Sequence, residues 1–166
     1  MSTNSQPLDL EGKAESAVIA WLQTSPRLKS RRIVSSAEES AKSNGTISVN
    51  AKRGAEVSPN SGVWEINVQV EFSLRIKPKS QSMNDFCAVK AAIAERFEIF
   101  WRSLIVELTR MRNDWHCYYV IVQGSNSDPQ EGMHHYALDL QLQAMPVTFA
   151  QAEAANVLIE NRQPFI

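Results

Sequence analysis

The chain has 166 residues, 43% of them hydrophobic and 21% charged, and its formal net charge is −1. This length suits one domain with a buried core, and the near-neutral charge gives no global reason to expect a nucleic acid or an anionic membrane as the main partner. Residues 1–7 lack the basic and apolar parts of a signal peptide, and no apolar run approaches the about 20 residues that span a bilayer. Cys87 and Cys117 are expected to be core thiols of a soluble protein in a reducing compartment.

The first predicted element is a helix that starts near Leu8. Residues 1–7 before it are polar, end in proline and are expected to form a flexible arm. Apolar residues then recur at spacings of three and four, and Pro26 prevents the helix from continuing. The basic group at 27–32 could face an acidic or phosphate partner, although a solvated surface is the simpler interpretation. Ile33–Val34 suggests a short strand.

A long alternating stretch from Trp64 to Lys77 dominates the chain. Every second residue is apolar and the residues between them are polar. This alternation predicts one β-strand with a buried apolar face and a solvent-exposed polar face. Residues 46–51 alternate more weakly, and residues 52–62 are rich in loop-forming residues. We therefore expect a hairpin with a long tip, whose second strand exceeds the usual ~5–6 residues.

A patterned helix is predicted to follow from Ser82. Its wide apolar stripe should pack across the apolar face of the long strand. A break in the helix is expected near Trp101–Ser103. The stripe consists of Phe86, Val89, Ile93, Phe97, Phe100 or Trp101, Leu104 and Leu108.

Two further strands are predicted in the last third of the chain. Residues 115–122 are apolar at both odd and even positions, so both faces of the strand would be apolar. This is typical of a strand that is central to its sheet or covered by a neighbour. A loop at 124–132 should connect them to a half-buried strand at 136–144. From Thr148, apolar residues at helical spacing predict a short C-terminal helix: Phe149, Ala152, Ala155, Val157 and Leu158.

These elements predict an α+β fold. Its sheet would be antiparallel, made of two hairpins in the order α-β-β-α-β-β, with the helices packed on one face. The expected organisation is a flexible arm at 1–7, a single α+β domain at 8–146, and a C-terminal helix and tail at 147–166. The apolar Phe165 and Ile166 would dock onto the core or onto a partner subunit.

The sequence offers no catalytic or metal-binding pattern. His116, His134 and His135 with Cys117 match no standard zinc spacing, and polar positions at strand ends explain them more simply. A nucleophile elbow and a phosphate-binding glycine loop are both missing. We therefore expect neither an enzyme nor a bound cofactor.

The order of the predicted elements and their residue patterns resemble those of the tail terminator (tail completion) and neck proteins of tailed bacteriophages. The likeness covers most of residues 10–146. It rests on the helix with Ala-Val-Ile-Ala-Trp-Leu, the flexible hairpin, the strand Trp-Glu-Ile-Asn-Val-Gln-Val-Glu-Phe-Ser-Leu-Arg-Ile, the long helix, and the closing strand Tyr-Ala-Leu-Asp-Leu-Gln-Leu-Gln-Ala.

This resemblance implies a structural virion protein that forms a ring, commonly of six subunits, which caps the tail tube and joins it to the head–neck connector. Genomic DNA would pass through the ring without sequence-specific binding, and no membrane is involved. The long strand and its hairpin would extend the sheet toward neighbouring subunits, so the interface candidates are Trp64, Glu65, Asn67, Gln69, Glu71, Arg75, Lys77, Phe165 and Ile166. The loops would reach a neighbouring ring or the lumen through Lys52, Arg53, Glu56, Asn60, Asp128 and Glu131.

Two other functions remain open from the residues. The first is a small ligand-binding or enzymatic domain with a pocket near the strand 115–122, lined by Tyr118, Tyr119, His116 and His135. The second is a nucleic-acid binder that uses the basic end of the long strand, where Arg75, Lys77 and Lys79 lie.

Overall fold

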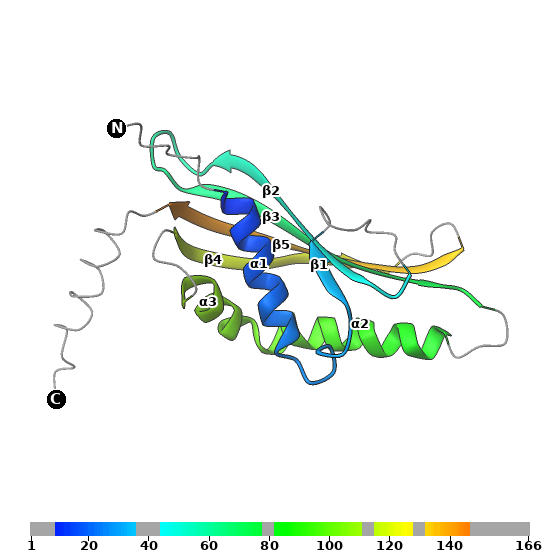
Figure 1. Ribbon diagram of the computed structural model, residues 1–166. Coiled ribbons are helices and arrows are strands. Elements are labelled where there is room, and N and C mark those ends of the chain that lie inside the picture. The colour runs from blue at the N-terminus through cyan, green and yellow to red at the C-terminus, as the bar shows by residue number, and fades with distance from the viewer. Residues whose placement is uncertain (1–8, 36–43, 78–81, 111–114, 128–131, 147–166) are drawn as a thin grey trace, which may run out of the picture.

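The computed structural model describes residues 9–35, 44–77, 82–110, 115–127 and 132–146. A five-stranded sheet has the order β1-β2-β3-β5-β4, and three helices lie against one of its faces (Figure 1). The elements in chain order are α1 (Leu10–Gln23), β1 (Ile33–Ser35), β2 (Ile47–Glu56), β3 (Trp64–Arg75), α2 (Ser82–Ile99), α3 (Trp101–Arg110), β4 (Trp115–Asn126) and β5 (Met133–Pro146).

The α+β class is confirmed, but the purely antiparallel sheet is wrong. β1 pairs with β2 in parallel, with Ile33 opposite Ile47, and the other neighbouring pairs are antiparallel. The expected order also omitted β1 and treated α2 and α3 as one helix. The sheet is therefore mixed.

Helix α1 begins at Leu10, two residues after the predicted start, with Asp9 as its N-cap. Asp9 precedes Leu10, and its Oδ1 accepts a hydrogen bond from the Gly12 backbone N–H at 2.9 Å. Such a side chain satisfies one of the donors that the first turn leaves unpaired. The predicted apolar stripe is the buried face of the helix, from Leu10 to Leu22.

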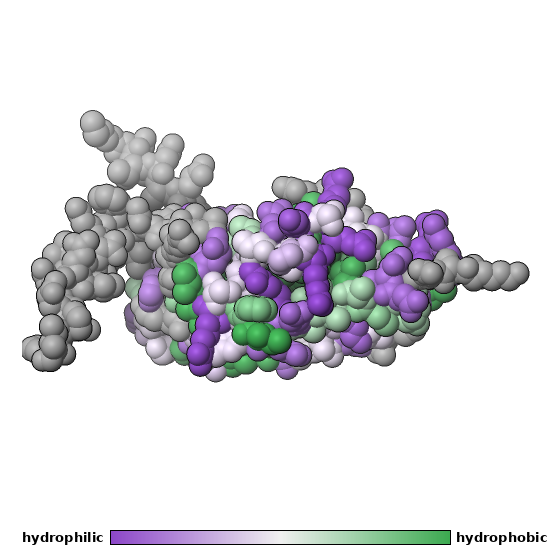
Figure 2. All heavy atoms as spheres, turned by 90° about the horizontal axis from the view of Figure 1, so that it is seen from below, coloured by the Kyte–Doolittle hydropathy of each residue, from purple (hydrophilic) through white to green (hydrophobic). Residues whose placement is uncertain are grey.

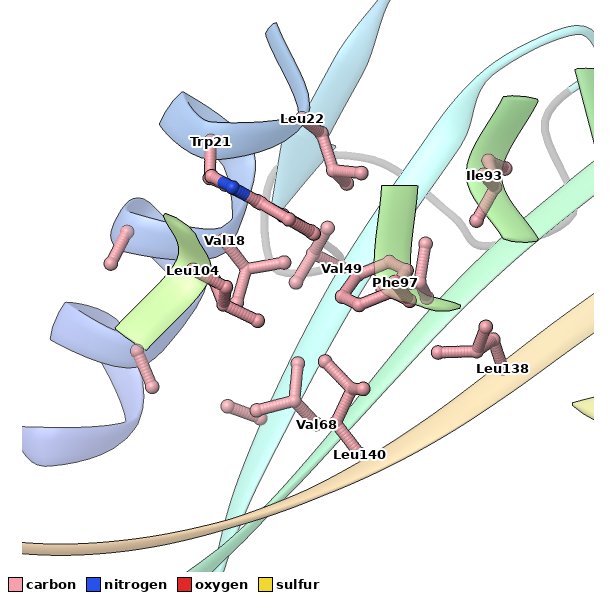
Figure 3. Packing of buried hydrophobic residues seen from close by; sticks show 14 of the residues in the cluster. Val18, Trp21, Leu22, Val49, Val68, Ile93, Phe97, Leu104, Leu138 and Leu140 are labelled. Atoms are coloured by element: carbon pink, nitrogen blue, oxygen red, sulfur yellow. The ribbon is translucent and has the colours of Figure 1, made fainter. Parts of the chain in front are cut away.

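The core fills the space between the helices and the sheet. Side chains from α1, β2, β3, α2, α3 and β5 converge there: Val18, Trp21, Leu22, Val49, Val68, Ile93, Phe97, Leu104, Leu138 and Leu140 (Figure 3). The Trp21 and Phe97 rings meet edge to face with centroids 4.8 Å apart. This geometry is favourable for aromatic pairs.

The alternation of β3 correctly predicts which residues face the helices. Ile66, Val68, Val70 and Phe72 are almost fully buried, and Val68 lies directly opposite Leu140 of β5. The side chains between them point to the other face, which the three helices leave uncovered. We call this polar surface the open face.

β2 and β4 extend beyond their predicted ends. β2 runs to Glu56 because it keeps register with β3 beyond Ala51 and resumes opposite Trp64 after a bulge, so much of the expected loop 52–62 is strand. β4 extends to Asn126 and therefore contains Gly124. The expected C-terminal helix and tail at 147–166 and the arm at 1–7 lie outside the described residues.

The long predicted helix breaks, as expected, near Trp101. α2 ends at Ile99 and α3 starts at Trp101, with Phe100 between them. Leu104 and Leu108 continue the buried stripe, whereas Phe100 and Trp101 are 43% and 39% exposed. The break turns these two aromatic side chains away from the core.

Candidate interaction surfaces

Among the described strands, β1 and β4 end the sheet, and β3 does not. β3 is paired with β2 on one side and with β5 on the other. Its backbone groups are used within the subunit, so β3 itself offers no free edge to a neighbouring strand. Its polar candidates Glu65, Asn67, Gln69 and Glu71 lie on the open face instead.

The edge of β2 is covered by acidic side chains of α1. β1 pairs with β2 only at Ile47, Ser48 and Val49. Just beyond, Glu15 Oε1 accepts a hydrogen bond from the Ala51 backbone N–H at 2.9 Å, and Glu15 Oε2 accepts one from Ser35 Oγ at 2.6 Å. Further along, Arg53 Nε lies 2.7 Å from Glu11 Oε1. A sheet edge that is covered by side chains is a poor template for another strand.

The edge of β4 is different. β4 has twelve residues and pairs with β5 alone among the described strands. It contains no Asp, Glu, Lys, Arg or Pro. Tyr119 and Val122 are 45% and 36% exposed, although α3 packs against this strand. β4 therefore lacks the charges and prolines that protect edge strands in other proteins. Of the two predicted alternatives, the strand is not central among the described strands, but α3 covers part of it.

Two bulges divide β4 into shorter segments. The pairing with β5 shifts between Cys117 and Tyr119 and again between Val122 and Gly124. Between the shifts, Tyr119, Val120, Ile121 and Val122 keep regular register with β5. Bulges bend a strand and interrupt its ladder, so these four residues form the straightest part of the free edge.

The open face carries a shallow hollow of about 320 Å³. Its polar lining comes from Asn50, Lys52, Asn67, Gln69, Gln123 and Asp139. Gln69 Nε2 donates a hydrogen bond to Asp139 Oδ1 at 3.1 Å, and Gln123 Nε2 donates one to Gln141 Oε1 at 3.2 Å. These amide side chains, together with Lys52 and Asp139, make this face polar.

The structure does not bring the histidines together. His116 lies opposite Met145 at one end of β5, whereas His134 and His135 lie at the other end. The buried His134 ring is 5.2 Å from the Phe86 ring, and His135 Nδ1 is 3.0 Å from Ser73 Oγ. In the part of the chain that the structure describes, no group of three or more His, Cys, Asp or Glu is placed to hold a metal ion.

The cysteines also have separate environments. Cys87 is exposed on α2 and Cys117 is buried in β4, and both are free. Burial raises the pKa of the Cys117 thiol to about 11, and its contact with the Tyr119 carbonyl oxygen opposes this only in part. A thiol with this pKa is a poor nucleophile at neutral pH.

Other predicted site residues are spread over several surfaces. Lys52 and Arg53 lie on β2, where the Arg53 guanidinium stacks 5.3 Å from the Trp64 ring, and Glu56 ends the strand. Asn60 lies in the turn, with a φ of 61°. Arg75 ends β3, and its backbone N–H donates to Asn44 Oδ1 at 2.8 Å; Lys77 follows it. Lys79, Asp128, Glu131, Phe165 and Ile166 lie outside the described residues.

The described hollows are not lined by the residues expected for a ligand pocket near residues 115–122. The hollow on the open face takes Gln123 from β4, and neither Tyr119 nor His116 nor His135 lines it. A second cleft of about 250 Å³ lies between the end of α1 and the end of α2, where Pro26, Ala92 and Phe100 line it with Arg27 and Glu95.

The junction of α2 and α3 forms a surface that the sequence analysis missed. Ile99, Phe100, Trp101 and Val106 are 65%, 43%, 39% and 57% exposed. We call these four side chains the helix-corner patch. Figure 2, which views the molecule from below Figure 1, shows hydrophobic side chains at this surface among hydrophilic ones. The only signal in the sequence was that the predicted stripe was too wide for one buried face.

Comparison of the sequence with models of protein families finds no match, and comparison with curated proteins finds none either. None of the described helices combines the length and the apolar character needed to cross a membrane.

Proposed function

We propose that this protein is a structural subunit that associates with copies of itself through the free edge of β4. In line with the resemblance to tail terminator proteins, the assembly would be a ring of about six subunits that caps a phage tail tube and joins it to the head–neck connector. DNA would pass through the ring, and the protein would belong to the neck of the virion. The observation that carries this proposal is the edge of β4, which pairs with no second described strand and carries no charged residue or proline, although two bulges interrupt it.

Strand addition gives such an edge a specific use. A strand from another subunit can pair with the exposed backbone groups between Tyr119 and Val122, so that the sheet continues from one subunit to the next. The contrast with β2 supports this role, because the fold covers that edge with Glu15 and leaves β4 uncharged.

A ring requires that the edge of β4 meets a different surface of the neighbour. Contacts between two different surfaces form a closed ring when the rotation between subunits closes. Pairing of β4 with itself would give a two-fold dimer instead. The polar open face, which holds Glu65, Asn67, Gln69 and Glu71, remains available for contacts with the tail tube or with DNA.

The proposal is tested by the native mass of the full chain, measured by light scattering across a concentration series and followed by negative-stain imaging. The decisive variant is Tyr119→Lys with Val122→Lys, which places charge on the free edge. Its matched control is Gln141→Lys, which adds one charge on the open face of β5 opposite Ile121.

We expect the unaltered chain and the Gln141→Lys control to form rings of about six subunits, and the β4 variant to stay monomeric with an unchanged circular dichroism spectrum. A monomer at all concentrations, or rings that the β4 variant leaves intact, would contradict the proposal. A discrete dimer would replace the ring by a two-fold assembly.

A further inference from the structure

The cleft between the ends of α1 and α2, which we call the α1–α2 cleft, contains an arginine whose partners are all neutral. The Arg96 guanidinium lies 4.9 Å from the Trp21 ring and 5.3 Å from the Phe100 ring. Its Nη2 donates hydrogen bonds to the Thr24 hydroxyl and, at 3.5 Å, to the Trp21 carbonyl oxygen. Its Nε is buried and has no acceptor among the described residues. Because none of these partners is a carboxylate, Arg96 keeps an uncompensated positive charge at the cleft.

The α1–α2 cleft has an aromatic wall beside this charge. Phe100, which is 43% exposed, lines the cleft together with Pro26 and Ala92. The volume of about 250 Å³ is smaller than the roughly 300–1,000 Å³ of pockets that enclose a drug-sized ligand. The cleft therefore suits one planar ring of a larger ligand, with a cation next to that ring.

A basic segment continues from the cleft. In a chain whose net charge is −1, the turn after α1 carries four cations within six residues: Arg27, Lys29, Arg31 and Arg32. We call this segment the basic turn. Arg27 lines the cleft with a side chain that is 67% exposed, and its Nη1 lies 3.2 Å from Glu95 Oε2. An ion pair this exposed is weak, so the turn extends the positive charge of the cleft along the surface.

The fold holds the backbone of the basic turn in place. Leu28 is fully buried, and the backbone N–H groups of Leu28 and Lys29 donate to the Ser25 carbonyl oxygen at 3.1 and 2.9 Å. The Arg32 carbonyl oxygen accepts a hydrogen bond from the Ile47 backbone N–H at 2.9 Å, which joins the turn to the sheet. Figure 1 shows this turn beside α2 on the lower side of the molecule, the side that Figure 2 views. A backbone that is already fixed loses little conformational entropy when a ligand binds.

The extent of the positive charge favours a polymeric anion over a small one. A single phosphate would need only the arginines of the cleft, whereas the basic turn continues the charge outside it. Proteins that bind single-stranded nucleic acids combine such a positively charged track with aromatic side chains on which bases stack. We propose that the α1–α2 cleft and the basic turn bind single-stranded nucleic acid without sequence preference. One base lies against Phe100 and Arg96, and the neighbouring phosphates lie on the basic turn.

This site is separate from the edge of β4, so it serves a monomer as well as a ring. Fluorescence anisotropy of the full chain with a labelled strand of about fifteen thymidines tests it, with salt raised from about 50 to 200 mM. The decisive variant is Arg27→Ala with Lys29→Ala. Its matched control is Arg75→Ala with Lys52→Ala, which removes one arginine and one lysine that are also exposed but lie on β3 and β2.

We expect the unaltered chain to bind the strand at low salt, and the basic-turn variant to bind about tenfold more weakly. The slope of log affinity against log salt should become less steep by about 0.7 for each phosphate contact that the variant loses. The control should keep the affinity and the slope of the unaltered chain. No binding by the unaltered chain at low salt, or an equal loss in the control, would overturn the proposal.

Substitution of the aromatic wall separates base stacking from charge. Phe100→Leu keeps an apolar side chain but removes the ring, so the affinity should fall about tenfold at an unchanged salt slope, whereas Phe100→Trp should retain the affinity. A labelled polyglutamate peptide should bind more weakly than the thymidine strand and without dependence on Phe100. Equal affinity for the peptide, or an unchanged affinity in Phe100→Leu, would overturn the assignment of the site to a single-stranded nucleic acid.

Discussion

The indole Nε1 of Trp21 lies 2.7 Å from Ser103 Oγ, although the two residues are 82 positions apart in the chain. This hydrogen bond joins the buried end of α1 to the first turn of α3. Trp21 is 2% exposed, so its N–H has little access to water. The contact fixes where the long predicted helix breaks and how its second part lies.

Removal of this acceptor should destabilise the protein. We expect Ser103→Ala to lower the free energy of unfolding by about 1–3 kcal/mol, because it leaves the buried indole N–H without a partner. Urea unfolding measures this change. The control Ser16→Ala removes an exposed hydroxyl from α1 and should stay within about 0.5 kcal/mol. Equal effects of the two variants would contradict the role of the hydrogen bond.

Glu15 should contribute more to stability than Glu11, although both lie on α1 and face β2. Glu15 bonds the Ala51 N–H and the Ser35 hydroxyl, so Glu15→Ala should cost about 1.5–3 kcal/mol. Glu11 forms an ion pair with Arg53, and the two side chains are 28% and 32% exposed. Glu11→Ala should cost less than about 1 kcal/mol. Chemical denaturation compares the two, and a larger loss for Glu11→Ala would refute the interpretation.

The two thiols should differ in reactivity. At pH 8 an alkylating reagent should modify Cys87, which is exposed, and leave Cys117 intact until the protein unfolds. Mass spectrometry of peptides identifies the modified residue. Rapid native modification of Cys117 would show that β4 opens readily and would contradict its burial.

The same burial makes stability depend on alkaline pH. The pKa of Cys117 rises from 9.0 to about 11 on folding, so the folded state retains the proton between these values and the unfolded state releases it. Stability is therefore full below pH 9 and decreases toward pH 11, by on the order of 2–3 kcal/mol from this group. Cys117→Ala should reduce the slope of unfolding free energy against pH in this window. Parallel slopes for the variant and the unaltered chain would contradict the assignment.

Two glycines should respond in opposite ways to alanine. Gly62 has a φ of +72°, in the left-handed region, so Gly62→Ala should cost about 1–2 kcal/mol even though the space around it is open. Gly124 has no neighbour within 4 Å of an added Cβ and no left-handed backbone. Gly124→Ala should be neutral or stabilising by up to about 1 kcal/mol. Thermal unfolding of the two variants provides the comparison, and a greater loss at Gly124 would disprove the prediction.

The sequence by itself determined the faces of the elements. The alternation from Trp64 to Arg75 identified which side chains of β3 enter the core, and the spacing from Leu10 to Leu22 identified the buried side of α1. Both patterns are local, because the period of a helix or strand decides the direction of each side chain relative to its neighbours.

Only the tertiary structure decided which strands are edges and which apolar residues stay outside. β3 is central because its partners in β2 and β5 come from distant parts of the chain, and no period within Trp64–Arg75 encodes that choice. The uncharged β4 has the composition of a central strand but ends the sheet of described strands. Phe100 and Trp101 follow the helical stripe yet lie outside, because the helix restarts at the corner that Trp21 and Ser103 hold. Strand order and helix breaks depend on contacts between distant residues, and those contacts form only when the chain has folded.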